Sequence, residues 1–175
     1  MRFAHAAIVA AMFAAPATAA DIENVRSLDM TVQGTIAQRC AMGTIGNMDF
    51  GDLNRPGLGA VARVSLDCNI PFNMQIRAQN GWLAHQQMPS GQGPYSGSLP
   101  YTIGVSMPIR KPRTSVVARN FEGRELQGAG RTISSEGGIA VDGMALSVAL
   151  GRPSGEAGLL AGEYGETIEI TITPS

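Results

Sequence analysis

Strict alternation of apolar and polar residues marks two segments, one near each end of the chain. In residues 28–36 the even-numbered positions hold the apolar residues and Gly34, and the odd-numbered positions hold polar residues. In residues 162–173 one parity holds Tyr164, Ile168, Ile170 and Ile172. A period of two is typical of a strand with one buried face. Both segments are predicted to be β-strands, and the second has the clearer pattern.

Shorter alternating runs between these segments predict the remaining strands. They cover residues 47–51, 62–68, 72–78, 99–107 and 144–150, with a weaker run at 115–121. Stretches rich in Gly, Pro, Ser and Gln predict surface loops at 52–59, 80–98, 123–138 and 151–162. A turn with solvated charges is predicted where Arg110, Lys111 and Arg113 lie among Pro108 and Pro112.

These seven or eight short strands, without a convincing helix, predict an all-β domain. Its 22 Gly and 10 Pro fit short strands joined by turns, and 175 residues suit one domain. The pattern favours an immunoglobulin-like β-sandwich.

The last strand is predicted to lack a partner on one edge. Only Pro174 and Ser175 follow it, so no downstream segment is expected to pair there. Unpaired backbone along a half-buried strand is costly and favours pairing with another chain. The sandwich is therefore expected to be incomplete, with an acceptor groove at Tyr164, Ile168, Ile170 and Ile172.

The candidate donor strand is formed by Leu28, Met30, Val32 and Gly34. Nine residues, 28–36, span about 27–31 Å when extended, which is enough to run along such a sheet. The alternative is that this segment is the domain's own first strand, acting in cis.

The first 20 residues are predicted to be a signal peptide. Arg2 precedes a short apolar run, Pro16 interrupts it, and small residues end it at Ala20. Residues 21–38 then form an N-terminal extension and 39–175 the sandwich domain. We expect an exported protein without a membrane span, because no later stretch is long and apolar enough.

Cys40 and Cys68 are the only cysteines of the chain. In an exported protein such a pair is expected to form a disulfide, and Cys68 lies on the inward parity of its strand. Closing this loop should stabilise the fold by about 3–4 kcal/mol on the chain-entropy model.

Little in the sequence supports catalysis, metal binding or nucleic-acid binding. The 13 Lys and Arg are dispersed and the net charge is −1. His85 is the only histidine after the leader and is predicted to be a solvated loop residue. A catalytic triad would depend on this one histidine, and a copper site would need two histidines. The carboxylates of Asp49, Asp52, Glu163, Glu166 and Glu169 are expected on turns or polar faces. No enzyme activity and no cofactor are predicted.

A leader followed by four motifs in order resembles the spore coat protein U family, whose members are subunits of archaic chaperone-usher pili. The four motifs are the cysteine after an alternating strand (Gly34 to Cys40), Met48-Asp49-Phe50-Gly51, Val64-Ser65-Leu66-Asp67-Cys68, and the ending that begins Gly162-Glu163-Tyr164. The ending is similar to the family's G-x-Y-x-D-T-x-x-V-T-V, with Glu166 in place of Asp.

The resemblance implies a subunit of a surface fibre, or of a spore-coat-like assembly, that polymerises by donor-strand exchange. It also implies three partners: a periplasmic chaperone, an outer-membrane usher and further subunits. The chain would then pass through the periplasm to the cell surface.

The alternative function is a secreted adhesin or lectin-like binding module. In that interpretation the loop at 80–98 carries the binding site, where Trp82 and Tyr95 would stack on sugar rings.

Overall fold

The computed structural model describes residues 27–175, so the predicted signal peptide and its cleavage point lie outside the described residues. The described residues fall into two units, 27–35 and Ile36–Ser175. Residues 27–35 carry no strand assignment and are exposed. All the secondary structure described below belongs to the second unit.

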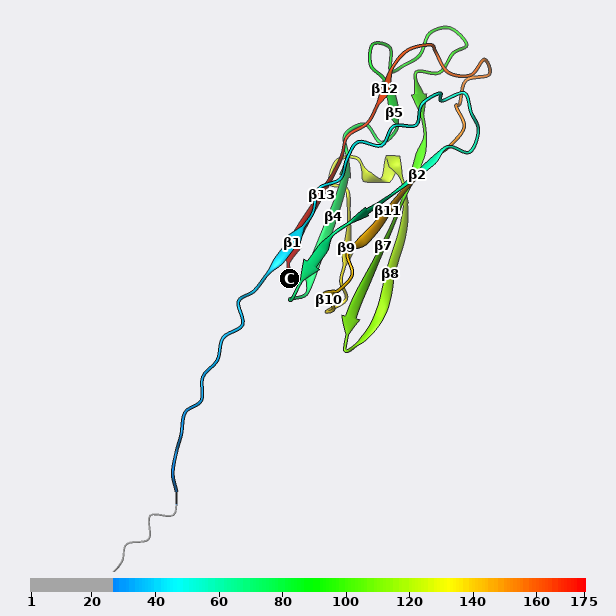
Figure 1. Ribbon diagram of the computed structural model, residues 1–175. Helices are drawn as coiled ribbons and strands as arrows, with labels where there is room; N and C mark the ends of the chain where they lie inside the picture. The colour runs from blue at the N-terminus through cyan, green and yellow to red at the C-terminus, as the bar shows by residue number, and fades with distance from the viewer. Residues whose placement is uncertain (1–26) are drawn as a thin grey trace, which may run out of the picture. The chain divides into compact units, whose positions relative to one another are not determined.

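The second unit is built almost entirely from antiparallel strands (Figure 1). Their bounds are β1 Cys40–Met42, β2 Gly59–Val64, β3 Leu66–Cys68, β4 Phe72–Ala78, β5 Leu83–His85, β6 Ser98–Leu99, β7 Tyr101–Lys111, β8 Arg113–Glu122, β9 Arg131–Ser134, β10 Ile139–Ala140, β11 Met144–Leu150, β12 Tyr164–Gly165 and β13 Ile168–Pro174. One 3-10 turn, η1 Gly123–Leu126, follows β8. The prediction of an all-β protein is confirmed.

The largest sheet has β7 at its centre. β8 pairs along one edge of β7, while β11 and β10 pair in succession along the other. β11 continues to β2, and β10 continues through β3 to β1. Only Ser65 separates β2 from β3, so these two strands follow one line with a local break.

Two smaller sheets complete the unit. β4 pairs with β13 on one side and β9 on the other, and β5 pairs with β12 and β6. The chain passes directly from β4 to β5 and from β12 to β13. Each of these two pairs is therefore one long strand with an interruption, and the two small sheets follow each other along it. Among residues 27–175, β4 is the only strand that pairs with β13.

All three sheets contribute to one hydrophobic core. The inward residues of β4 alternate with exposed ones, and Phe72, Met74 and Ile76 are fully buried. They join the inward residues of the largest sheet in a single cluster, which includes Ile103, Val105, Met107, Met144, Leu146 and Val148. Alternation in the sequence therefore places the core residues correctly in β4, β7 and β11.

Several predicted boundaries were wrong. Residues 47–51 alternate in burial but belong to no strand. β7 continues through Pro108 to Lys111, and the turn to β8 is at Pro112 alone, because a ten-pair ladder with β8 runs to the end of both strands. The last strand is split into β12 and β13 at Glu166, rather than running unbroken through residues 162–173.

Two predicted loops contain regular structure. β5 lies inside the predicted loop 80–98, and η1 and β9 lie inside 123–138. Both strands are short and rich in polar or small residues, so periodicity does not identify them; their partners β12, β6 and β4 order them.

Candidate functional site

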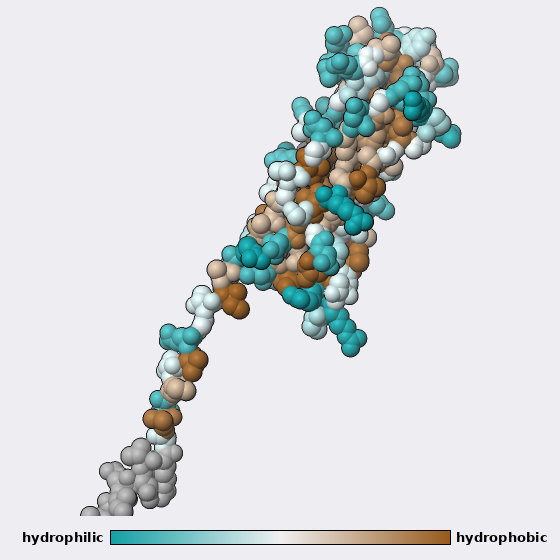
Figure 2. All heavy atoms as spheres, in the orientation of Figure 1, coloured by the Kyte–Doolittle hydropathy of each residue, from teal (hydrophilic) through white to brown (hydrophobic). Residues whose placement is uncertain are grey.

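A groove of about 980 Å³ runs beside the last strand. Its floor comes from the inner face of the largest sheet, including Ile103, Leu146 and Val148. One wall is β13, through Ile168 and Ile170, and the other is the segment 45–54. Three parts of the chain that are distant in sequence thus leave a channel open on the surface, with apolar side chains on its floor and polar side chains also in its lining. Figure 2 shows apolar residues, in brown, exposed on this unit.

The free edge of β13 forms part of this groove. The Gln79 N–H donates to the Thr167 carbonyl, and the Ser175 N–H donates to the Pro71 carbonyl. Because hydrogen-bonded pairs alternate in an antiparallel ladder, the odd-numbered residues of β13 bond to β4. The even-numbered residues, Ile168, Ile170 and Ile172, therefore direct their N–H and C=O groups away from β4. No described residue pairs with them there.

The predicted acceptor residues occupy this edge with one difference. Tyr164, Ile168 and Ile170 line the groove, whereas Ile172 does not. Ile172 is half-buried toward the end of β13, where β1 lies alongside without forming a ladder with it (Figure 1). Along this edge the groove thus extends from Tyr164 to Ile170 and ends before Ile172.

The Met48-Asp49-Phe50-Gly51 motif forms part of the wall opposite β13. Met48 and Phe50 pack against the core, while Asp49 is exposed and accepts a hydrogen bond from the Gly51 N–H at 2.8 Å. Gly51 has φ of +61°, a conformation that a side chain disfavours. This turn holds an extended segment without ladder partners along the groove, which is why its alternation gave a wrong strand prediction.

The predicted donor residues are exposed. Leu28, Met30 and Val32 are 95%, 80% and 81% exposed, and Gly34 follows on the same parity. Figure 2 shows apolar and polar side chains alternating along residues 27–35. The segment therefore presents a continuous apolar face that no strand of the described chain covers.

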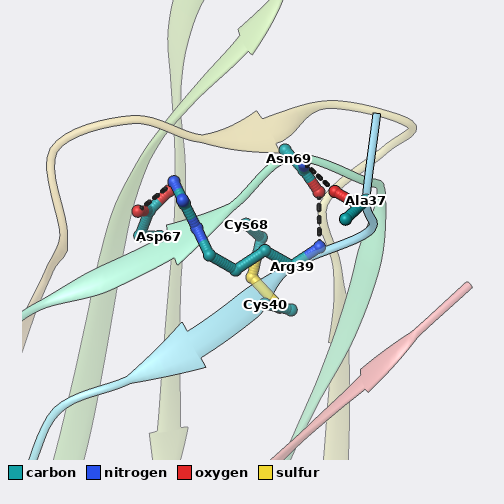
Figure 3. Close-up of polar contacts among 6 residues, drawn as sticks. All are labelled: Ala37, Arg39, Cys40, Asp67, Cys68 and Asn69. Carbon is teal, nitrogen blue, oxygen red and sulfur yellow. Dashed lines mark hydrogen bonds and ion pairs between the residues drawn. A yellow bond between two sulfur atoms is a disulfide. The ribbon is translucent and has the colours of Figure 1, made fainter. Parts of the chain in front are cut away.

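A disulfide and a set of hydrogen bonds fix the chain at the beginning of the second unit (Figure 3). The predicted Cys40–Cys68 disulfide is present, and the two residues are direct partners in the β1–β3 ladder. The Asn69 side chain accepts from the Arg39 N–H at 2.7 Å and donates to the Ala37 carbonyl at 2.8 Å. Arg39 also pairs with Asp67 at 2.6 Å. Residues 37–40 are thereby held to residues 67–69.

Glu166 stabilises the break between β12 and β13. Its carboxylate accepts hydrogen bonds from the Asn80 N–H at 3.0 Å and the Thr167 N–H at 2.7 Å. These two backbone groups lie where both strand lines are interrupted, so the carboxylate replaces the missing ladder bonds. This role for an acidic residue is not visible in the alternation pattern.

The prediction that His85 is a solvated loop residue was wrong. It is 5% exposed and ends β5. Nδ1 accepts from the N–H groups of Gln87 and Met88, at 3.1 and 3.0 Å, and Nε2 donates to the Ala161 carbonyl at 3.1 Å. Its ring packs edge-on against Tyr164, with centroids 5.2 Å apart. The histidine is a structural connection between β5 and the loop before β12.

Two tyrosines near the groove differ in how their hydroxyls are satisfied. The Tyr164 hydroxyl lies 2.8 Å from the Leu160 carbonyl and 3.0 Å from that of Ser96. The Tyr101 hydroxyl is buried and has no hydrogen-bond partner among the described residues. Burial raises the pKa of Tyr101 above its usual range, and the charge of Glu166 adds to this. Burial also raises the pKa of Tyr164, which the Leu160 hydrogen bond opposes.

The residues considered for sugar binding, Trp82 and Tyr95, are partly exposed and do not line the groove. No cluster of three potential metal ligands occurs in residues 27–175. Over the same residues, no helix has the length and apolarity to cross a bilayer.

Comparisons with known proteins find no matching family model, no matching curated protein and no matching solved structure.

Proposed function

We propose that the protein is a structural subunit that polymerises by donating its N-terminal strand to the groove of another copy. The observation that carries this proposal is the groove beside β13, where an open channel with an apolar floor coincides with unpaired backbone at Ile168 and Ile170. In this interpretation the second unit is an incomplete immunoglobulin-like sandwich, and the occupant of the groove is its missing strand.

The chemistry of residues 27–35 supports this occupant. A strand added to an open edge gains main-chain hydrogen bonds, and its alternate side chains enter the interior. Leu28, Met30 and Val32 offer such side chains on one parity. The other parity carries Asp29, Thr31 and Gln33, which would face solvent.

The geometry of the second unit also supports propagation. Residue 37 is held by Asn69, close to Phe72, which pairs with Pro174 beyond one end of the groove. Tyr164 lines the other end. A donor strand antiparallel to β13 would leave the acceptor at the Tyr164 end, so the next domain would follow in line. Head-to-tail addition of this kind does not close on itself and produces a fibre.

Export and assembly factors belong to the same proposal. The predicted signal peptide would direct the chain to the periplasm, where a chaperone would cover the groove until an outer-membrane usher exchanges it for the next subunit. The resemblance to spore coat protein U subunits supports these partners. The final location would be the cell surface.

The proposal is tested by placing a charge on the inward parity of the donor. Met30→Asp should abolish fibre formation, since a buried unpaired charge costs about 3–5 kcal/mol in the acceptor groove. Polymer length after refolding, measured by electron microscopy and sedimentation velocity, reports the effect.

Thr31→Asp is the matched control, because it adds the same charge one residue later on the outward parity. It should polymerise as the unmodified chain does, and both variants should show the same unfolding transition of residues 36–175. Equal polymerisation of the two variants would contradict donor-strand exchange.

A further inference from the structure

We propose that the groove also docks a second surface of the next copy, the basic tip of its β7–β8 hairpin. This inference rests on the proposed function and names the partner surface of the same site. It concerns charges at the mouth of the groove that the insertion of an apolar strand does not explain.

The charged residues that line the groove are all acidic. They are Asp49, Asp52, Glu163 and Glu166, and no Lys or Arg is among the lining residues. Glu166 is engaged by two backbone N–H groups, but the other three are exposed and form no ion pair within residues 27–175. Hydrogen bonds from Asn54 lower the pKa of Asp52, and the charge of Arg55 adds a smaller lowering. We call Asp49, Asp52 and Glu163 the acidic rim.

The strongest concentration of positive charge lies at the end of the β7–β8 hairpin. Arg110, Lys111 and Arg113 surround Pro112, and all three are exposed. None of them forms an ion pair with any described residue. We call these three residues the basic tip. Figure 1 shows the hairpin projecting at the end of the unit.

The basic tip lies beside the place where the chain enters the second unit. A surface depression of about 480 Å³ is lined by Arg110 and Thr114 of the hairpin together with Arg39 and Asn69. Asp67 and Asp142 also line it, and Asp67 is already paired with Arg39. A donor strand that enters a neighbouring groove therefore brings the basic tip of its own domain toward that neighbour.

The rim and the tip of one copy are too far apart to neutralise each other. Tyr101, at the start of β7, lines the groove, and Lys111, at the end of β7, belongs to the tip. Ten steps along a strand cover about 33 Å, while charges are screened over about 10 Å at 0.1 M salt. Two copies in line would instead place the tip of one against the rim of the other. Complementary charges of this kind raise the rate and the specificity of association.

Charge reversal tests the contact in the full-length chain. Lys111→Glu combined with Arg113→Glu should slow polymerisation roughly tenfold at low salt, and Asp52→Lys with Glu163→Lys should do the same. Mixing the two reversed chains should restore a rate close to that of the unmodified chain, because reversed tips then meet reversed rims. At about 1 M salt, where screening acts over about 3 Å, the differences should vanish.

A synthetic peptide of residues 27–36 separates the two levels of the proposal. It should bind the tip variant as tightly as the unmodified chain, since the tip lies outside the groove. If it binds and the tip variant also polymerises at the unmodified rate, the docking inference is overturned while strand donation stands. If only the rim variant polymerises more slowly, the inference is also overturned, because the rim would then bind a basic surface other than the tip. If the peptide does not bind the unmodified chain, strand donation itself fails.

Discussion

At the scale of single residues, a few polar side chains form hydrogen bonds with backbone groups that have no partner in a strand ladder. Asn69 replaces missing ladder bonds at residues 37–39, Glu166 does so at the break between β12 and β13, and His85 joins β5 to Ala161. Gly162, with φ of +150°, leaves room for the His85 ring, because a Cβ there would lie 2.2 Å from Nε2. The contacts of Glu166 and His85 order the chain that lines the groove, and those of Asn69 order the beginning of the second unit.

The two tyrosine hydroxyls allow a matched test of how a hydrogen-bond partner changes the contribution of a hydroxyl to stability. Tyr101→Phe should leave stability unchanged or raise it by about 1 kcal/mol, because it removes a buried hydroxyl without a partner. Tyr164→Phe should lower stability by about 1 kcal/mol, because its hydroxyl is bonded to Leu160. Urea unfolding of both variants measures the free energies. A larger loss for Tyr101→Phe than for Tyr164→Phe would show that the Tyr101 hydroxyl has a partner, such as a buried water.

At the scale of elements, alternation predicted the strands that have one buried face. It located the core parity of β4, β7, β11 and β13. The Cys40–Cys68 disulfide was predicted on a different ground, because these are the only two cysteines of the chain. Alternation failed at residues 47–51, where a half-buried segment has the pattern of a strand but lacks a ladder partner. It also missed β5 and β9, whose order comes from tertiary pairing rather than from their own residues.

The element-scale prediction concerns the free edge of β13. A copy of residues 27–36 joined after Ser175 through a flexible linker should fill the groove of its own chain. The fused protein is expected to be a monomer with a raised unfolding temperature, since its edge is paired and the apolar floor of its groove is covered. Sedimentation velocity and thermal unfolding measure the two effects.

The control fusion carries Met30→Asp and Val32→Asp in the added copy only. It should self-associate as the unmodified chain does, because its native donor segment is intact and its groove remains empty. Monomeric behaviour of this control would mean that the added length, rather than strand pairing, prevents association.

At the scale of the whole molecule, each unit leaves apolar side chains uncovered. Residues 27–35 expose Leu28, Met30 and Val32, and the second unit has a groove bordered by the free edge of β13. The sequence predicted the residues of the proposed donor and of the proposed acceptor, and their pairing stays a prediction. It could not predict the acidic rim, because Asp49, Asp52 and Glu163 come together only when segment 45–54 and the loop before β12 line the same groove.

Amide hydrogen exchange along β13 tests the central claim most directly. NMR would follow the N–H groups of Ile168, Ile170 and Ile172 in the chain with and without the peptide of residues 27–36. Glu169 and Thr171 serve as internal references, because their N–H groups already bond to β4. Strand donation predicts that the Ile168 and Ile170 amides, which border the groove, are slowed by roughly tenfold or more on peptide binding, while the references change little. Unchanged exchange at these two isoleucines under saturating peptide would contradict it.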